Sequence, residues 1–380
     1  MSAHRESCDV VVIGGGLIGC SIAWQLALRG LRVRVVERDT PARSASWAAA
    51  GMLSPVGEHG HVDQLRRLAD ASLDLYADFI DAVQDATGID PQYRRSGKLH
   101  VALTESDLES IRSAFGPDDA QALSADEVRK LEPGVTASAA GGFLVERDHH
   151  VDNRLLGRAV WIAAAGAGAT FDNGTAVVAI EREGNRVTGV RFATGELVDA
   201  DFVIVAAGAW SGNIAGISPL PVVPVRGQMC AFESVPPPLN RVVATSSVYV
   251  IPRANGRTLV GATLEHAGFR NECTGGGIRM LLDAAIEAVP ALANAALAEM
   301  WSGLRPGTVD GLPIIGPDPD AAGLIHATGH YRNGILLAPI TAEIVSTLVI
   351  GQTPRIDIRP YQVERFRDRA DAARAPAVTS

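Results

Sequence analysis

A glycine-rich turn near the N-terminus constrains the fold of this 380-residue chain more than any other feature. Residues 9–13 (DVVVI) are apolar and β-branched, which predicts a short buried strand, and residues 17–29 predict a helix. Gly14, Gly16 and Gly19 lie between and within these elements in the spacing G-x-G-x-x-G. A strand, a glycine turn and a helix in this order are typical of a βαβ unit that holds a pyrophosphate at the helix N-terminus.

A second strand follows, and a carboxylate lies at its end. Residues 32–36 (RVRVV) predict this strand, and Glu37 comes 18 residues after Gly19. An acidic residue roughly 20 positions beyond the glycine turn accepts hydrogen bonds from ribose hydroxyls in dinucleotide-binding folds. The alternative is a solvated strand end paired with Arg34 or Arg38. The pattern favours an ADP-containing cofactor on a parallel, doubly wound α/β sheet, without separating FAD from NAD.

Composition excludes several classes of protein. Hydrophobic residues make up 47% of the chain, which is enough for a large core, and the net charge of −9 argues against a surface for nucleic acid or an anionic membrane. We find no apolar run long enough to cross a bilayer or to form a signal peptide. Four widely spaced cysteines, without a Cys-x-x-Cys pair, are typical of a reduced cytoplasmic protein.

Two further segments carry small residues where a backbone could approach a flat ring. The first is the loop 44–52 (SASWAAAGM), for which a short alanine-rich helix start is the alternative. The second is 206–211 (AAGAWS), which follows a buried strand and could equally reflect sheet packing. Two proline-rich runs between 219 and 238 indicate that the chain crosses there from one domain to the other.

Two arginines lie in glycine-rich turns near the C-terminus, within 303–308 (GLRPGT) and 329–334 (GHYRNG). A planar guanidinium suits a carboxylate, and a helix that begins near Gly334 would favour negative charge at its N-terminus. A structural salt bridge is the alternative for either arginine. Arg226 is interpreted as structural, and His149 with His150 as a loop ahead of a helix rather than as a metal site.

The remaining elements are predicted from periodicity. We expect helices over 63–87, over 276–300 with an interruption at Pro290, and over 334–349. Three strand-like runs between 176 and 207, joined by glycine turns, predict a β-meander.

Taken together, these motifs resemble the D-amino-acid oxidase family of FAD-dependent amine oxidoreductases over residues 8 to about 350. The segments VYVIPR and VGATLE contribute to the resemblance. Within the family, GLRPGTVDGLPIIG and GHYRNGILLAP are similar to the glycine oxidase branch of the thiamine pathway. The resemblance implies a noncovalent FAD, since related sarcosine oxidases use a cysteine in the C-terminal third and none follows Cys273 here.

The resemblance also implies a two-domain fold. A Rossmann-like FAD-binding domain of the p-hydroxybenzoate hydroxylase type is expected to comprise 1–88, 145–220 and 300–365. An α+β substrate domain with an antiparallel sheet is expected to comprise 89–144 and 221–299. Residues 366–380 are expected to be a frayed tail.

The resemblance assigns residues to the site by position. Arg305 would bind the substrate carboxylate, Tyr249 would donate its hydroxyl to the same group, Arg332 would line the pocket, and the Gly51 carbonyl would accept from the amine. No catalytic side chain is expected, because flavin N5 does the chemistry. The expected cofactor contacts are Gly14, Gly16, Ile18, Gly19, Glu37, Arg38, Ser44, Ser46, Ala49, Ala50, Gly51, Met52, Val178, Ala207, Gly208, Trp210, Arg305, His330, Arg332, Asn333, Gly334, Ile335 and Leu336. Ser247 and Leu264 replace a histidine and a methionine of the family.

The implied reaction is oxidative deamination of glycine, and also of sarcosine and small D-amino acids. A hydride would pass from Cα to flavin N5, O2 would be reduced to H2O2, and the imine would feed thiazole synthesis. The family also implies a homotetramer. Two alternatives stay open: a D-amino-acid dehydrogenase that passes electrons to a quinone or carrier, and a nonenzymatic flavin or nucleotide sensor.

Overall fold

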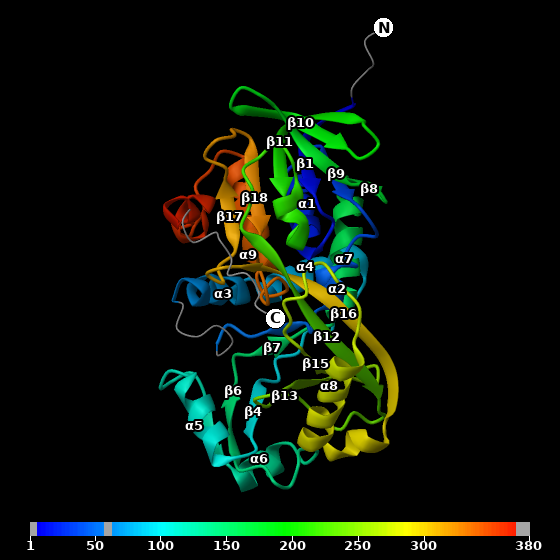
Figure 1. Ribbon diagram of the computed structural model, residues 1–380, viewed down its shortest axis with the longest axis vertical. Helices are drawn as coiled ribbons and strands as arrows, with labels where there is room; N and C mark the ends of the chain where they lie inside the picture. Colours follow the sequence, from blue (N-terminus) through cyan, green and yellow to red (C-terminus); the bar gives the residue numbers. More distant parts are fainter. Residues whose placement is uncertain (1–5, 57–62, 370–380) are drawn as a thin grey trace.

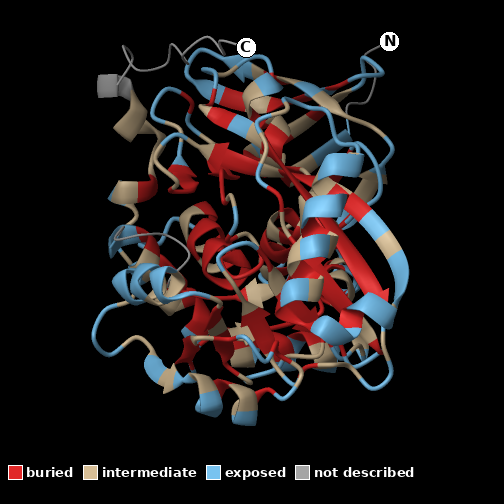
Figure 2. Cartoon of the chain, turned by 60° about the horizontal axis from the view of Figure 1, so that its bottom comes forward, coloured by how far each residue is buried: buried red, intermediate tan, exposed pale blue. Residues whose placement is uncertain are grey.

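The computed structural model describes residues 6–56 and 63–369 and contains two large β-sheets (Figure 1). One sheet lies in the upper half of that view and the other in the lower half. Buried strands run through both halves, and helices with an exposed face surround them (Figure 2). None of the helices in the described part of the chain has both the length and the apolar run that a bilayer crossing requires.

The first sheet has the strand order β17-β18-β11-β1-β2-β8, and β10 and β9 continue it from β11. Its strands are β1 (Glu6–Ile13), β2 (Val33–Glu37), β8 (Thr170–Asn173), β9 (Val177–Glu183), β10 (Arg186–Phe192), β11 (Leu197–Val205), β17 (Ile314–Pro317) and β18 (Leu324–Thr328). The five strands from β18 to β8 pair in parallel, whereas β9, β10 and β11 form the antiparallel meander expected from the sequence. The predicted Rossmann-like α/β fold is thereby confirmed.

Helices from three parts of the sequence share one apolar core with this sheet. They are α1 (Leu17–Ala27), α3 (Asp63–Asp74), α4 (Tyr76–Thr87), α7 (Asn153–Gly166) and α9 (Ala338–Val349). Helix α1 is buried on almost every side because α7 and α9 flank it, which explains why its sequence is apolar all round. The core strand residues Val10 and Val12 are completely buried beneath it.

The second sheet has the order β16-β12-β15-β14-β13-β4-β6-β5. Its elements are β4 (Lys98–Ala102), α5 (Glu105–Ser113), β5 (Gln121–Ser124), α6 (Ala125–Leu131), β6 (Gly141–Val145), β12 (Val222–Glu233), β13 (Val242–Ala244), β14 (Tyr249–Pro252), β15 (Arg257–Gly261), α8 (Gly275–Ala288), η2 (Pro290–Asn294) and β16 (Ala296–Thr308). All pairs are antiparallel except β13 with β4. Helix α8 covers one face with apolar residues at helical spacing, from Ile278 through Leu281 and Ala285 to Ala288.

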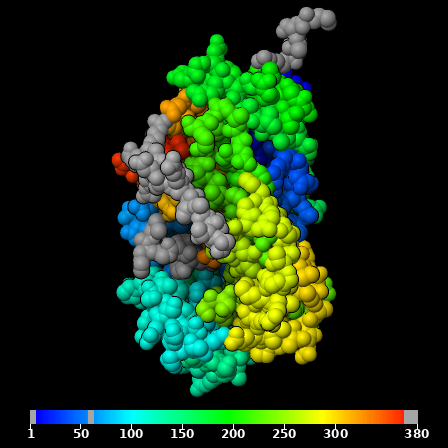
Figure 3. All heavy atoms as spheres, in the orientation of Figure 1, coloured from blue at the N-terminus to red at the C-terminus, as the bar shows by residue number. Residues whose placement is uncertain are grey.

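Segments far apart in the sequence build this second half. In the space-filling view, the cyan residues near 100–145 and the yellow residues near 260–300 lie on either side of its lower part (Figure 3). Short elements complete the fold: α2 (Ala45–Ala48), β3 (Met52–Leu53), β7 (His149–His150), η1 (Gly208–Asn213), η3 (Arg359–Tyr361) and η4 (Val363–Arg369).

Three predicted helices have different bounds. The helix expected over 63–87 is two helices that break at Leu75, where Ser72 Oγ and Tyr76 Oη donate to the carbonyls of Leu336 and Ile335. The final helix begins at Ala338 instead of residue 334, because Pro339 fits only in a first turn.

The third difference lies after Pro290. Helix α8 ends at Ala288, and residues from Ala296 onward form β16 instead of further helix, because they pair with β12 along its whole length. Residues 300–308, which were expected in the FAD-binding domain, belong to β16 and so pair within the second sheet. Of the expected tail 366–380, residues 366–369 belong to η4, and residues 370–380 lie outside the described residues.

Candidate active site

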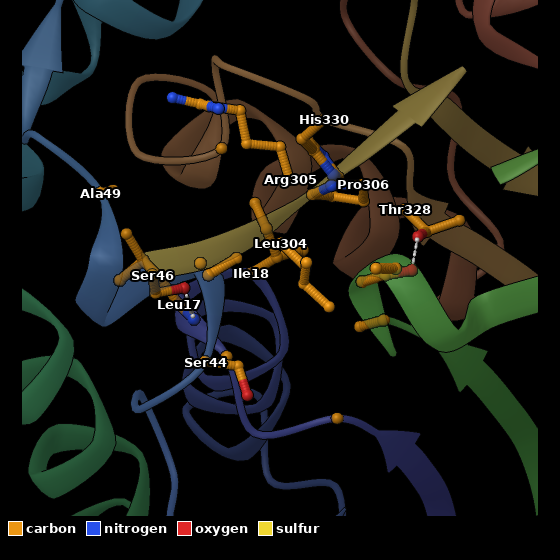
Figure 4. Close-up of a pocket in the computed structure, with 18 of the residues that line it drawn as sticks. Leu17, Ile18, Ser44, Ser46, Ala49, Leu304, Arg305, Pro306, Thr328 and His330 are labelled. Carbon is orange, nitrogen blue, oxygen red and sulfur yellow. Dashed lines mark hydrogen bonds between the residues drawn. The ribbon is translucent and has the colours of Figure 1, made fainter. Parts of the chain in front are cut away.

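A large pocket lies where the two sheets meet, and residues from both sheets line it. The β1–α1 turn, the end of β2, the segment 44–54 and the turns after β11 and β18 come from the first half, and β12, Tyr249 and β16 come from the second. Figure 4 shows Ser44 on one side of the view and Arg305 with His330 on the other, with Leu17 and Ile18 between them.

The glycine turn shapes one wall of the pocket. Gly14 has φ +107°, and a Cβ there would lie 2.5 Å from the Ala206 carbonyl oxygen. A Cβ at Gly19 would lie 1.9 Å from the Gly14 carbonyl oxygen, so this glycine lets α1 pack against the turn and does not itself line the pocket. Gly16 lines the pocket, and the next N–H, that of Leu17, donates to Ser46 Oγ at 3.0 Å (Figure 4). The turn therefore presents backbone without side chains, as a pyrophosphate requires.

Glu37 is held in place by backbone N–H groups. Its Oε2 accepts from Gly15 N at 2.8 Å and its Oε1 from Asp39 N at 3.0 Å, and the side chain lines the pocket. Arg34 forms an ion pair with Asp172 instead, so it does not supply the pairing considered as an alternative. Each carboxylate oxygen keeps a second lone pair, which leaves Glu37 oriented and able to accept from a ribose hydroxyl.

Arg38 does not pair with Glu37 either; it stacks on an aromatic ring. Its guanidinium carbon lies 3.3 Å from the centroid of the Trp210 ring, and both residues line the pocket. Burial lowers the pKa of Arg38 below its usual value, yet an arginine remains charged. Trp210 follows Ala207 and Gly208, whose carbonyl accepts from Thr328 Oγ1 at 3.2 Å (Figure 4).

The small-residue loop 44–52 begins with a short helix, and most of it also lines the pocket. Residues Ala45–Ala48 form the short helix α2, and Ser44, Ser46, Ala49, Ala50, Gly51 and Met52 line the pocket. Distant side chains fix the loop through its carbonyls: Asn153 Nδ2 donates to Ser46 O at 2.8 Å, Trp301 Nε1 to Ala48 O at 3.0 Å, and Arg253 Nη2 to Ala50 O at 2.7 Å. The loop is thus a rigid wall of backbone and methyl groups.

Arg305 and Tyr249 enter the pocket from the second sheet, and each lies over a glycine. A Cβ on Gly227 would lie 2.2 Å from Arg305 Nη1, and one on Gly261 would lie 2.6 Å from the Tyr249 ring. Arg305 Nη1 donates to the Thr263 carbonyl oxygen at 3.2 Å. Within residues 6–56 and 63–369, no carboxylate pairs with Arg305, so its fork is available to an anionic ligand.

The turn after β18 contributes Arg332, His330, Asn333, Gly334 and Ile335 to the lining. Arg332 is exposed. His330 is buried and bonded through Nε2 to Thr341 Oγ1 at 3.0 Å, and burial lowers its pKa to about 3, so its ring is neutral near pH 7. Because α9 begins only at Ala338, the helix N-terminus expected near Gly334 lies further along the chain.

Besides Gly19, two expected cofactor contacts do not line the pocket, and the expected amine acceptor already has one donor. The Gly51 carbonyl accepts from Val151 N at 2.9 Å, which uses one of its two lone pairs and leaves the other for an amine. Val178 is 43% exposed and turns away, because side chains alternate along β9 and the adjacent Val177 lines the pocket instead. Leu336 is buried in the core beside α1 and does not reach the pocket.

Sequence reasoning also missed part of the substrate wall. Met229 lines the pocket, and its sulfur lies 3.9 Å from the Tyr249 hydroxyl oxygen. Gly227 lines it as well. The only signal for both was their place in the segment VRGQM, which becomes informative once β12 is known to pair with β16.

His149 and His150 make structural contacts. His149 Nδ1 is bonded to Tyr93 Oη at 2.7 Å, and the backbone of His150 pairs with Arg94. No group of three potential ligands able to hold a metal ion occurs among the described residues.

The comparisons with known proteins agree with this geometry. Residues 9–348 match the model of the family of FAD dependent oxidoreductases, and the chain belongs to this family. It is therefore an enzyme that uses FAD, and the side-chain-free turn, the fixed Glu37 carboxylate and the wall of small residues fit a dinucleotide of this kind.

Within the family, the chain is similar to glycine oxidases. It is 37% identical to glycine oxidase of Pseudomonas aeruginosa, over 93% of this chain and 97% of that protein. It matches a crystal structure of glycine oxidase from Geobacillus kaustophilus with a TM-score of 0.90 and 33% identity, over 95% of this chain and 99% of that one. It is also 37% identical to a bifunctional ThiO/ThiG protein of Trichormus variabilis, over 95% of this chain, and it spans only 56% of that relative.

Proposed function

We propose that the chain oxidises glycine and other small amino acids with FAD and O2. The observation that carries this proposal is the pair Arg305 and Tyr249, which line the same pocket from strands β16 and β14 of one sheet. A guanidinium without a carboxylate partner among the described residues, in the same pocket as a phenol, is suited to bind a carboxylate. The similarity to proteins named glycine oxidase supports the same substrate class.

The walls around this pair favour a small substrate. Met229 and the small-residue loop that includes Gly51 border the space beside Tyr249. Neither Ser247 nor Leu264 lines the pocket; both are exposed. The two departures from the family pattern therefore lie outside the pocket wall, and we propose that Met229 limits the size of the substrate side chain instead.

The pocket offers no obvious acid–base pair. Among the described lining residues Glu37 is the only carboxylate, and two backbone N–H groups hold it. His330 is neutral and hydrogen-bonded to Thr341.

When bound, FAD supplies the acceptor for the hydride lost from Cα and passes the two electrons to O2. The chain's own part is to bind the carboxylate through Arg305 and Tyr249, and so to orient Cα.

FAD is proposed to be bound without a covalent link. All four cysteines of the chain lie in the described residues, and none of them lines the pocket. The similarity to a bifunctional ThiO/ThiG protein supports a further proposal, that the imine product feeds thiazole synthesis.

A substrate panel tests the proposal. The FAD-bound enzyme is given glycine, sarcosine, D-alanine or D-proline, and O2 uptake and H2O2 are measured together. We expect steady O2 uptake with a matching amount of H2O2 for at least one of these small amines. Turnover only with a quinone or dye would favour a dehydrogenase, and no turnover with any acceptor would contradict the proposal.

A further inference from the structure

The loop between β15 and α8, residues 262–274, connects the proposed substrate clamp to a buried polar cluster. Thr263 is the link, since it is almost fully buried and its carbonyl accepts from Arg305 Nη1 at 3.2 Å. Its hydroxyl donates to Glu265 Oε1 at 2.5 Å and accepts from Gln228 N at 2.9 Å. The position of the carbonyl that meets Arg305 therefore depends on Glu265 and Gln228.

Glu265 accepts hydrogen bonds from three side chains of this cluster. Its Oε2 accepts from Arg226 Nη2 at 2.5 Å, and its Oε1 accepts from Gln228 Nε2 at 2.7 Å as well as from Thr263. Its backbone also exchanges two hydrogen bonds with Arg226, at 2.9 and 3.0 Å. Burial opposes ionisation, but the hydrogen bonds from Thr263, Arg226 and Gln228 hold the pKa of Glu265 below its usual value.

The cluster also closes the far end of the loop. Gln228 Nε2 donates to Thr274 Oγ1 at 3.0 Å, and Thr274 N donates to Gln228 Oε1 at 2.8 Å. Thr274 is the N-cap of α8, and Gln228 lies so close to the first turn that a Cβ on Gly277 would be 2.4 Å from its Nε2. Both ends of the loop are therefore fixed to β12 through one glutamine and one carboxylate.

We infer that Glu265 is a positioning residue for Arg305: it fixes the Thr263 carbonyl, and through it the guanidinium that binds the substrate carboxylate. This inference rests on the proposed function. Neither Glu265 nor Thr263 lines the pocket, so the effect is indirect. Among the described residues, the Arg305 guanidinium has no carboxylate partner, and the Thr263 carbonyl is its only hydrogen-bond acceptor. The position of the guanidinium in the free enzyme therefore depends on that bond.

Replacement of Glu265 by glutamine keeps the shape of the side chain but removes its charge and changes its hydrogen bonds. Both carboxylate oxygens accept from donors, whereas an amide presents N–H groups on one side. In Glu265→Gln one donor must therefore face another, either Arg226 on one side or Thr263 and Gln228 on the other. Such a mismatch loosens the loop without removing volume.

Glu272 supplies a matched control. It pairs with the same arginine, through Arg226 Nη1 at 3.2 Å, but its side chain is 55% exposed, compared with 29% for Glu265. Among the described residues, Glu272 shares no hydrogen bond or ion pair with Thr263 or Gln228. Glu272→Gln removes a carboxylate from Arg226 and leaves the support of Thr263 intact.

The test measures binding of acetate, an unreactive carboxylate, to the FAD-bound enzyme from the change in flavin absorbance, together with KM and kcat for glycine. For Glu265→Gln we expect acetate Kd and glycine KM to rise about tenfold, equivalent to the loss of about one hydrogen bond to a charged group. The kcat value and the FAD dissociation constant should stay close to wild type. For Glu272→Gln all four quantities should stay close to wild type.

A second variant covers the case in which Glu265→Gln folds poorly. Thr263→Val keeps the carbonyl and the side-chain shape but removes the hydroxyl that joins Glu265, and it should raise acetate Kd in the same direction. Equal acetate Kd in Glu265→Gln and Glu272→Gln, or a wild-type acetate Kd in Thr263→Val, would overturn the inference. A wild-type enzyme that neither binds acetate nor oxidises glycine would overturn the proposed function and this inference with it.

Discussion

The two halves of the pocket are built in different ways. Two walls of the cofactor half, the Gly14 turn and the loop 44–52, consist of backbone and small residues that are close together in sequence. The substrate half consists of long side chains, Arg305 and Tyr249, that come from separate strands and lie over glycines of two further strands. In the cofactor half, glycines and small residues must leave room for the ligand. In the substrate half, neighbouring groups must hold the long side chains of Arg305 and Tyr249 in position.

This difference predicts separable defects. Changes in the cofactor half should alter FAD binding and stability, whereas changes in the substrate half should alter KM for a carboxylate substrate and leave FAD bound. A variant in one half that produced the defect of the other would break the comparison.

The largest effect is expected for Arg305→Ala in the substrate half. Loss of the guanidinium removes a charge-assisted and partly desolvated interaction, so kcat/KM for glycine should fall by about 2–5 kcal/mol in transition-state free energy, mostly through KM. Steady-state kinetics measures this fall, and absorbance of the purified enzyme measures retained FAD. An unchanged KM would exclude Arg305 as the carboxylate ligand.

In the cofactor half, Gly14→Ala should lower the free energy of unfolding and weaken FAD binding. The added Cβ would lie 2.5 Å from the Ala206 carbonyl oxygen, at a backbone φ of +107°. Strain and overpacking of this kind cost about 1–3 kcal/mol. Thermal unfolding and FAD titration measure both quantities. Gly166→Ala is the control, because a Cβ there meets no atom within 4 Å.

Gly227→Ala makes the same chemical change in the substrate half. Its Cβ would lie 2.2 Å from Arg305 Nη1, so the guanidinium must move. We expect glycine KM to rise by the equivalent of about 1–3 kcal/mol, while FAD affinity stays at the wild-type value. A loss of FAD without a change in KM would show that the two halves are not separable at this strand.

The effect that is smallest at neutral pH concerns the protonation of His330. Burial lowers the pKa of His330 to about 3, whereas an unfolded histidine has a pKa of about 6.5. Between these values the unfolded state binds more protons, so the free energy of unfolding falls as the pH falls from about 6.5, by about 1.4 kcal/mol per pH unit for this group. Urea unfolding at several pH values measures the slope. His330→Gln should have a slope smaller by that amount, and an identical slope would contradict the buried neutral state.

The same division explains what the sequence could reveal. The βαβ unit and its Glu37 were predictable because the glycine spacing and the strand pattern are local signals. Arg305 and Tyr249 were located by resemblance, but their support by Gly227 and Gly261 was not, since it depends on pairing between strands that are distant in sequence. The helix expected over 276–300 was wrong after Pro290 for a similar reason. Residues from Ala296 onward pair with β12, and this pairing outweighs their own helix propensity.

The central claim is that Arg305 and Tyr249 hold a small amino acid where bound FAD can oxidise it. Anaerobic addition of glycine to the FAD-bound enzyme, followed by flavin absorbance, tests this claim most directly. We predict that the flavin band bleaches with saturation in glycine, and that Arg305→Ala needs a much higher glycine concentration for the same bleaching. A flavin band that glycine does not bleach, or equal bleaching in Arg305→Ala, would contradict it.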